Sequence, residues 1–583
     1  MGALEEPPLE WSRGWLPPDL SRTDDDTAPV SGPLARACAA LRRSWRRSDW
    51  LFQTFFADGE PAARPLLVKP IRLRHPFLFY LGHLPAFAHN RLQVVCGKEY
   101  RVAPLPRTLT TAQLQELDVL FERGMDPDVD DPTRCHRHSE VPDAAEDWPS
   151  VTMVAAYRDY VRQQMVQQLE RVAAAGDITT PTPTTASKEP WLRLAWMVVE
   201  HELMHIETLC YMLQQTDARW KKQLEWKAEE RDGIGHGAET TPQQRHSFVP
   251  IGACATGPSR TAVTLGCNPP THAPTRPDPI SPPFLWDNEM PQVVRSVRVP
   301  YLMAVYPVTN GEYLRFVQAG GYRQVDAFWD APSDAPWLAR ERLLWPRCWR
   351  AHPHAGQRNG AGSMDAVPAL YALRIDGTLV PYPLGDARCV ANDWPVYVSL
   401  AEARAYVRWH TRECARRGRC RHRFRLPTED EWQLAADGIR YPDADAEGNG
   451  AEPSEGNYHW GRLSPVSVRA SDNPSRYGVH DLLGNGWEWT DTVFAPLDAR
   501  RFTPTDMYPE YSQDFFDGKH YVMRGASWAT DRQLVRPSFR NWYHARYPYA
   551  FAKFRLVCDT ACEGGDACGQ VVAHAPNAKG RVY

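Results

Sequence analysis

The chain has no continuous run of about 18 apolar residues, the length that would span a membrane. Its first residues, MGALEEPPLEW, hold neither an apolar signal core nor a basic leader, which favours a cytoplasmic protein. The cysteines lack any CxxC spacing, since all 13 are scattered between Cys38 and Cys568. This pattern argues against a zinc ribbon and against a disulfide framework, and we expect reduced thiols.

A strong charge of one sign is missing as well. Lys and Arg number 67 against 71 Asp and Glu, a net charge of -4, whereas nucleic-acid binding needs a basic excess on one face. A strand followed by G-x-G-x-x-G and a helix is also absent, because the GIGHG segment at 233–237 has no apolar strand before it. We therefore expect neither a nucleic-acid partner nor a fused Rossmann-type methyltransferase domain.

Proline and aromatic residues are abundant. Pro accounts for 52 of 583 residues, about 9% against an average near 5%, which indicates long ordered loops. The 22 Trp, 23 Tyr and 19 Phe offer flat apolar faces that pack cores and bind organic cations. With 43% hydrophobic and 24% charged residues, most of the chain is predicted to be globular.

Helical periodicity follows an irregular arm at residues 1–30. Apolar residues repeat at i, i+3/i+4 along four stretches. The first begins at Ser31, and the other three cover Phe77 to Asn90, Ser150 to Gly176, and Trp191 to Gln215. A long crossover separates the second stretch from the third. This arrangement predicts a four-helix bundle over residues 31–224.

The remainder of the chain has a different pattern. The charged, Gly-rich stretch at 225–245 predicts a linker. From 246 to 560, short apolar strands alternate with Pro/Gly/Asn-rich loops, and we expect helices at Asn310 to Gln318 and at Leu400 to Arg416. This is typical of one large α+β domain, followed by a flexible tail at 561–583. The predicted fold class is therefore multidomain, α followed by α+β.

The segment HELMHIET carries the sharpest chemical signal. His201 and His205 are four residues apart on a predicted helix, so both rings project from one face and can share a metal ion. HELMH also fits the H-E-x-x-H motif of zinc proteases, in which Glu202 would be the general base. The metzincin form fails, because Thr208 and Tyr211 stand where it needs Gly and His. Two histidines satisfied inside a bundle remain the structural alternative.

A third ligand is expected from a facing helix. The stretch RHPFLFYLGHLPAF offers His83, with His75 and His89 as competitors. A second cluster, Cys135 to His138, lies in a Pro/Asp-rich loop, and we interpret it as solvent-exposed. Three neutral imidazoles leave a divalent ion with its full charge and with open positions for a thiolate and dioxygen. Iron(II) can perform such redox chemistry and zinc(II) cannot.

Several ordered motifs resemble a known enzyme family. RHPFLFYLGHLPAF, FERGMDPDVDDP and EHELMHIETLCYML resemble the DinB-like N-terminal domain of ergothioneine-type sulfoxide synthases, and the wording is closest to the fungal branch. VPIGACATG, YPVTNGEYLRFV, RLPTEDEWQLA, GNGWEWT and RGASWAT are similar to the formylglycine-generating-enzyme-like, C-type-lectin-related domain of the same enzymes.

This resemblance implies a nonheme Fe(2+) enzyme that uses O2 to join cysteine sulfur to the imidazole of hercynine (trimethylhistidine), giving hercynylcysteine sulfoxide. It also implies that His83, His201 and His205 are the iron ligands. The methyltransferase domain of the fungal enzymes is not found in this sequence, so we expect a separate histidine methyltransferase to supply hercynine.

The resemblance assigns residues of the second domain as well. Tyr508, in the element YPEY, matches a proton-donating tyrosine, and Tyr511 matches a substrate contact. Asn541 and Trp542 match an Asn-Trp pair at the hercynine head. A quaternary ammonium has no N–H, so its recognition should rely on aromatic faces, while Asn541 can bind the carboxylate. From the residues alone, ordinary packing is the alternative for all four.

Three departures from the family pattern refine these expectations. Tyr543 and Tyr547 stand where the bacterial branch that takes γ-glutamylcysteine has an acidic residue and an arginine, so free cysteine is the expected thiol. Met204 stands where that bacterial branch has an amide side chain, so the resemblance does not identify the residue that would contact the imidazole of the substrate. The segment 539–549 has no cysteine, so we do not expect the formylglycine-generating reaction.

Other functions stay open at the level of sequence. Within the superfamily, the alternatives are a 5-histidylcysteine sulfoxide synthase, as in the ovothiol pathway, and a selenium-donor variant. Alternatives from other classes are a zinc hydrolase built on HELMH and a non-catalytic binding protein.

Overall fold

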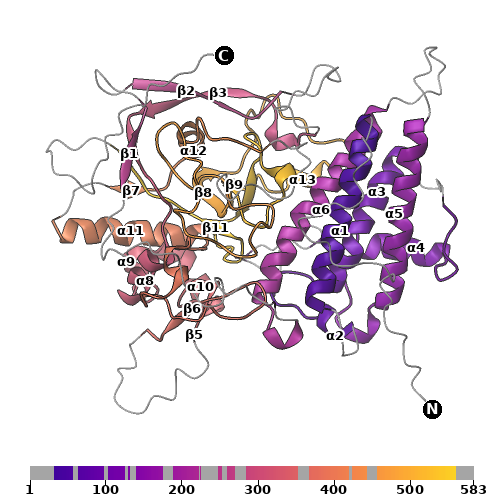
Figure 1. Ribbon diagram of the computed structural model, residues 1–583, viewed down its shortest axis with the longest axis horizontal. Helices are drawn as coiled ribbons and strands as arrows, with labels where there is room; N and C mark the ends of the chain where they lie inside the picture. The colour runs from indigo at the N-terminus through magenta and orange to yellow at the C-terminus, as the bar shows by residue number, and fades with distance from the viewer. Residues whose placement is uncertain are drawn as a thin grey trace.

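The structure is a computed structural model of the chain (Figure 1). It describes residues 32–56, 63–97, 103–124, 129–130, 139–174, 188–221, 224, 247–252, 259–268, 284–351, 367–418, 423–442 and 456–559. The expected arm, linker and tail and the Cys135 to His138 cluster lie outside these residues.

The N-terminal part is a helical bundle, as its periodicity predicts (Figure 1). Its helices are α1 (Pro33–Phe56), α2 (Ala63–Leu66), α3 (Phe77–Cys96), α4 (Thr111–Leu120), α5 (Val151–Ala174) and α6 (Glu189–Gln215). The helix α3 contains Pro85 in its interior and continues past its expected end at Asn90 as far as Cys96. The short helices α2 and α4 were not expected, and α4 occupies the long crossover.

Close packing in α3 depends on Gly82. A Cβ atom at this position would lie 2.5 Å from the ring of Phe121, the fully buried residue at the end of α4. Only glycine lacks the side chain that would collide there. The residue that precedes His83 therefore determines how closely α4 approaches α3.

The second part is an α+β domain built around small sheets. One four-stranded sheet has the order β1-β4-β12-β7 and is antiparallel throughout, and the other has the order β10-β9-β8-β11. The strands of these two sheets are β1 (Phe248–Ile251), β4 (Tyr301–Ala304), β7 (Phe424–Arg425), β8 (Gly486–Val493), β9 (His520–Ala526), β10 (Asn541–His544), β11 (Ala552–Lys553) and β12 (Val557–Asp559). Two further ribbons pair β2 (Ser259–Leu265) with β3 (Val293–Val299), and β5 (Trp349–Ala351) with β6 (Leu370–Ala372).

The helices of this domain begin at recognisable caps. Thr309 and Ser399 accept hydrogen bonds from the backbone N–H three residues later, and the glutamates at those positions complete both capping boxes. The bounds of α8 and α11 therefore agree with the predicted ones. The helices are α8 (Asn310–Gln318), α9 (Val325–Phe328), α10 (Ala331–Glu341), α11 (Leu400–Arg416), α12 (Glu429–Ala435) and α13 (Glu510–Gln513).

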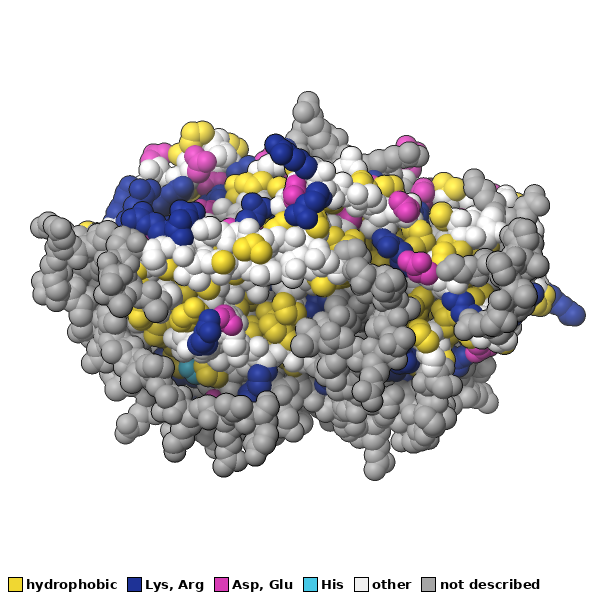
Figure 2. All heavy atoms as spheres, turned by 90° about the horizontal axis from the view of Figure 1, so that it is seen from above, with side chains coloured by type: hydrophobic (Ala, Val, Ile, Leu, Met, Phe, Trp, Pro, Cys, Tyr) yellow, Lys and Arg dark blue, Asp and Glu magenta, His cyan; other side chains and the backbone are white. Residues whose placement is uncertain are grey.

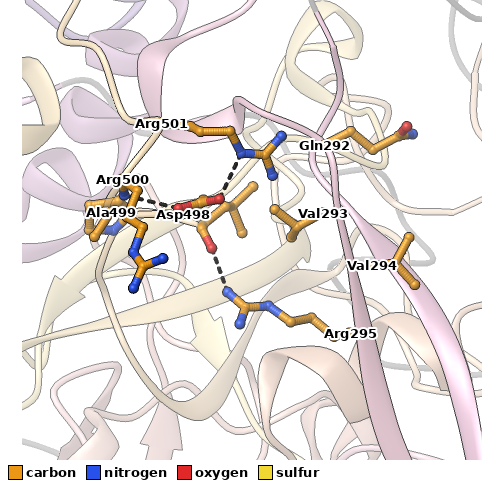
Figure 3. A pocket seen from close by; sticks show the side chains of 10 residues that line it. Gln292, Val293, Val294, Arg295, Asp498, Ala499, Arg500 and Arg501 are labelled. Carbon is orange, nitrogen blue, oxygen red and sulfur yellow. Dashed lines mark hydrogen bonds and ion pairs between the residues drawn. The ribbon is translucent and has the colours of Figure 1, made fainter.

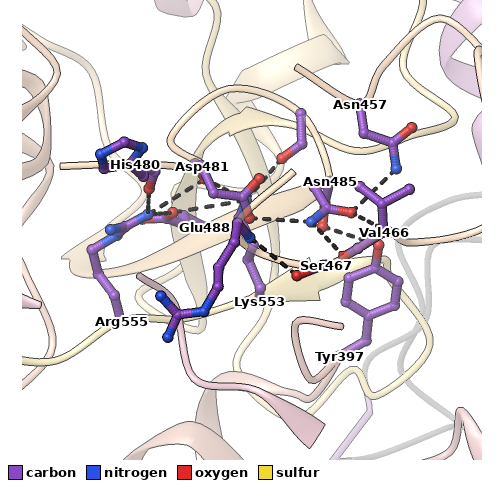
Figure 4. A network of polar contacts seen from close by, with 12 residues as sticks. Tyr397, Asn457, Val466, Ser467, His480, Asp481, Asn485, Glu488, Lys553 and Arg555 are labelled. Atoms are coloured by element: carbon purple, nitrogen blue, oxygen red, sulfur yellow. Dashed lines mark hydrogen bonds and ion pairs between the residues drawn. The ribbon is translucent and has the colours of Figure 1, made fainter. Parts of the chain in front are cut away.

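A buried polar network ties β8 to β11 and the segment after it (Figure 4). Glu488 accepts from Arg555 Nε and from Trp432 Nε1, both at 2.8 Å. The Lys553 ammonium donates to Asp481 Oδ2 at 2.9 Å. Because these charges are paired and hydrogen-bonded, they can lie inside the core without the full cost of an isolated buried ion.

The two parts meet along α6, the bundle helix that lies next to the α+β domain in Figure 1. Glu200 accepts from Trp286 Nε1 at 2.7 Å and from Arg536 Nη1 at 2.8 Å. Two turns later, Glu207 accepts from three neutral donors of the other domain. These two buried carboxylates fix the side of α6 that faces the α+β domain.

Among the described residues, none of the helices combines the length and apolar character that a membrane crossing requires. On the face drawn in Figure 2, side chains of both charge signs stand between hydrophobic ones.

Candidate metal centre

Three histidines converge at the junction of α3 and α6. Each of His83, His201 and His205 offers a nitrogen atom, and these atoms all lie within 4.8 Å of one another. The ring centroids are 5.2 Å apart for His83 and His201, 4.8 Å for His83 and His205, and 4.5 Å for His201 and His205. His83 and His201 are buried and His205 is partly buried. The three rings are close enough to share one ion.

The hydrogen bonding of His83 prepares it for a metal. Its Nδ1 lies 2.7 Å from the carbonyl oxygen of Phe121. A carbonyl can only accept, so Nδ1 carries the proton and Nε2 keeps its lone pair. This orientation follows from the close approach of α4 at Gly82.

The other two rings are also suited to coordination. His201 stacks on Phe87 at 3.6 Å between centroids, with 8° between the planes. The Nδ1 atom of His205 is buried and has no hydrogen-bond partner in the described part of the chain. Burial lowers the pKa of His83 to about 4 and holds the pKa values of His201 and His205 well below 6.5. All three are therefore neutral imidazoles, the form that binds metals, and the residues present fit a divalent transition metal.

The competing residues lie elsewhere. His89 Nδ1 is 2.8 Å from Asp118 Oδ1, inside the bundle. The His75 ring lies 4.1 Å from that of Phe79, tilted by 34°, and is not part of the cluster. Glu202 Oε1 accepts from Ser48 Oγ of α1 at 2.5 Å, on the side of α6 that faces the bundle interior. This position is unsuitable for the general base of a zinc hydrolase.

A cavity of about 170 Å³ opens beside the three histidines. Both parts of the chain line it, and the residues from outside the cluster include Arg74, Tyr80, Arg123, Met204, Trp487, Tyr508, Tyr511, Asn541, Trp542 and Tyr543. The four second-domain residues predicted from the resemblance thus lie in the wall of this cavity. Their roles remain predictions.

The two tyrosines have different surroundings. The Tyr508 ring meets Phe87 of α3 edge to face, at 5.2 Å between centroids. Tyr511 is buried, stacks on Trp286 at 3.8 Å and donates from its hydroxyl to Met204 Sδ at 3.4 Å. Burial raises the pKa of Tyr511 well above 10, so this phenol stays protonated.

The Asn-Trp pair lies on β10. Trp542 stacks on Phe494 at 4.2 Å and meets Tyr511 edge to face at 5.2 Å. Asn541 Oδ1 accepts from the backbone N–H of Trp542 at 2.8 Å. These contacts fix the orientation of the indole in the cavity wall.

Arginines of the bundle complete the wall, and sequence reasoning did not identify them. Arg74 Nε donates to the hydroxyl of Tyr547 at 3.0 Å, and its guanidinium lies 5.1 Å from the centre of that ring. The rings of Tyr543 and Tyr547 are stacked at 5.0 Å. Tyr543 lines the cavity, and Tyr547 supports it from behind through this stacking. Arg74 precedes the motif histidine His75 directly, and no spacing rule marks it.

A second cavity of about 640 Å³ lies on the α+β domain (Figure 3). Gln292 to Arg295 and Pro496 to Arg501 line it, and Arg501 pairs with Asp498 at 2.7 Å. None of the predicted site residues lines this cavity.

Comparison with known proteins matches both parts of the chain. The DinB superfamily matches residues 40–209, and the Sulfatase-modifying factor enzyme 1-like domain matches residues 238–560. Ergothioneine biosynthesis protein 1 of Neurospora crassa is 29% identical over 540 residues, which cover 85% of this chain and 55% of that protein. The hercynine oxygenase of Mycobacterium tuberculosis is 34% identical over 300 residues, or 48% of this chain and 58% of that protein.

The inactive C-alpha-formylglycine-generating enzyme 2 of Mus musculus is 30% identical over 263 residues, covering 42% of this chain and 68% of that protein. The chain spans about half the length of its fungal relatives, 55% and 52%. The predicted fold class and the resemblance to ergothioneine-type sulfoxide synthases are confirmed by these matches. With more than half of its 583 residues matched, the chain belongs to the Sulfatase-modifying factor enzyme 1-like family and carries a DinB-superfamily bundle ahead of that domain.

Proposed function

We propose that the chain is a nonheme iron(II) enzyme that couples the sulfur of cysteine to the imidazole of hercynine with O2, forming hercynylcysteine sulfoxide. One observation carries this proposal. Three neutral imidazoles on α3 and α6 face a cavity that the second domain closes with Tyr508, Trp542 and their neighbours. Two relatives are named ergothioneine biosynthesis protein 1 and hercynine oxygenase, and these names support the proposal.

The electron count is self-consistent. Joining carbon to sulfur removes two electrons, and oxidising the sulfur to the sulfoxide removes two more. One O2 accepts all four and leaves one oxygen atom in the product and one in water. No external reductant is needed.

In this proposal His83, His201 and His205 hold the ion, and bound iron(II) supplies the redox chemistry for O2. Tyr508 donates a proton from its phenol during the reaction, a role suited to a group with an ordinary pKa near 10 in an enclosed site. Trp542 offers its ring to the trimethylammonium group, and Asn541 binds the carboxylate of the same substrate.

The thiol side of the cavity supports a small substrate. By the family resemblance, Tyr543 and Tyr547 stand where the branch that takes γ-glutamylcysteine has an acidic residue and an arginine, so that ion pair for a glutamyl arm is missing at these two positions. Free cysteine is therefore the proposed donor. A separate histidine methyltransferase is the proposed source of hercynine.

Reconstitution of the metal-free protein under anaerobic conditions tests this function. Iron(II), cysteine, O2 and either hercynine or histidine are then added, and O2 uptake, product mass and the ring position of the new bond are measured. We expect O2 uptake only when iron(II), cysteine and hercynine are all present. Turnover with histidine at the other ring carbon would favour the ovothiol-type alternative, and zinc-dependent hydrolysis without O2 would contradict the proposal.

Variants separate the ligand assignment from loss of fold. His83→Ala should abolish O2 uptake. His89→Ala removes a buried histidine from the same helix outside the cluster, and Glu202→Gln removes the carboxylate that a zinc hydrolase would need. Both control variants should retain uptake.

A further inference from the structure

One face of α3 links the candidate metal centre to Tyr508. His83, Phe87 and Arg91 are spaced four residues apart, so they line one side of the helix. The ring of Phe87 stacks on His201 at 3.6 Å and meets Tyr508 at 5.2 Å. Phe87 therefore separates a candidate ligand from the candidate proton donor.

Arg91 contacts the segment that carries this tyrosine. Its Nη1 donates to the backbone carbonyl of Met507, the residue before Tyr508. Its guanidinium carbon lies 5.6 Å from the ring centre of Tyr508 and 5.6 Å from that of Phe87. The Arg91 side chain of the bundle thus contacts both the backbone next to Tyr508 and the ring of Tyr508 itself.

The far end of the same segment is held independently. Arg123 of the bundle pairs with Asp514 at 2.5 Å, and Ser512 donates to Asp287 at 2.5 Å. Loss of Arg91 would therefore release the part around Tyr508 while the segment as a whole stays docked.

We propose that Arg91 is a positioning residue for Tyr508. Its contacts with the backbone carbonyl of Met507 and with the face of the Tyr508 ring direct the phenol into the cavity. The reaction assigned to Tyr508 rests on the proposed function, whereas the positioning itself does not. A planar guanidinium can stack on a ring and donate at its edge together, which an ammonium group cannot do in the same way.

Fluorine NMR of the metal-free protein with 3-fluorotyrosine at position 508 tests the positioning directly. The protein with Arg91 should give one narrow resonance. Arg91→Met should shift and broaden it, or split it, and Arg91→Lys should do so in part. Arg42→Met removes an exposed arginine that pairs with Glu170 and should leave the resonance unchanged. An unchanged resonance in folded Arg91→Met or Arg91→Lys protein would overturn the proposal.

Product partition gives the second readout. Arg91→Met should lower the ratio of sulfoxide to uncoupled oxidised cysteine by about two- to thirty-fold, the range of a lost cation–π contact. The affinity of this variant for cobalt(II) should stay within about twofold of the wild-type value, because Arg91 offers no ligand atom to the histidine cluster. On a Tyr508→Phe background, Arg91→Met should change the ratio no further. An additive effect there would contradict action through Tyr508.

These outcomes separate the two ideas. If the wild-type protein forms no sulfoxide, the proposed function fails, and the fluorine resonance alone decides the role of Arg91.

Discussion

The phenol of Tyr508 is the group whose loss should alter chemistry without altering binding. Tyr508→Phe keeps the ring that packs on Phe87 and removes only the O–H. We expect sulfoxide formation to fall by about 10²-fold or more, the usual contribution of a positioned acid, while oxidised cysteine without a ring bond increases. Product analysis by mass spectrometry checks this. A wild-type product ratio would contradict the assigned role.

The indole of Trp542 should affect one substrate more than the other. Trp542→Ala removes the ring that lines the cavity and stacks on Phe494. A cation–π contact is worth about 0.5–2 kcal/mol, so the KM for hercynine should rise about two- to thirty-fold. The KM for cysteine should change less. Trp542→Phe, which keeps a flat face, is the matched control, and equal effects on both substrates would argue against a trimethylammonium contact.

Residue identity could be predicted where a motif and a helical period coincide. His201 and His205 follow from their four-residue spacing, while His83 needed the family resemblance to separate it from His75 and His89. Arg91 was not found, because its contact to Met507 joins residues 416 positions apart. Such contacts depend on how the two domains dock, and no local pattern encodes docking.

At the scale of elements, the approach of α4 to α3 should control the metal site. Gly82→Ala would place a Cβ atom 2.5 Å from the Phe121 ring, and the carbonyl of Phe121 orients His83. Displacement of that carbonyl should weaken iron(II) affinity by about 10- to 100-fold, as for other residues that orient a ligand. Metal titration measures it. Gly461→Ala, where a Cβ meets its nearest neighbour at an ordinary 3.6 Å, should bind normally.

The contacts that Glu207 of α6 makes with the second domain should contribute to the free energy of unfolding. Glu207 accepts from Trp487 Nε1 at 2.8 Å, Ser527 Oγ at 2.6 Å and Thr530 Oγ1 at 2.8 Å. Glu207→Ala leaves the Trp487 and Ser527 donors without this acceptor, at a cost of about 1–3 kcal/mol for each, while Thr530 Oγ1 can still donate to Ser527 Oγ. Urea unfolding should show the loss. Glu170→Ala, which removes an exposed acidic side chain, should change the free energy of unfolding by less than about 0.5 kcal/mol.

Helices were more predictable than strands. The bounds of α8 and α11 agree with the sequence expectation because a Ser or Thr followed three residues later by Glu marks each start. The helix α4 also has a complete capping box, Thr110 with Gln113, yet it was missed inside a polar crossover. Strands such as β7 and β11, two residues each, exist only through their partners and leave no periodic signal.

At the scale of the whole molecule, the candidate site belongs to neither domain alone. The three clustered histidines come from the bundle, and the tyrosines, Asn541 and Trp542 come from the α+β domain. The buried carboxylates of α6, together with Arg91 of α3 and Arg123 in the segment after α4, join the two. In the proposed function, the bundle would hold the ion and the second domain would select the substrate.

The most direct test of this account is diffraction at the iron absorption edge, from crystals grown anaerobically with iron(II). The account predicts one anomalous peak between the rings of His83, His201 and His205, and its loss in His83→Ala. A peak at another site, or a peak that survives in that variant, would contradict it.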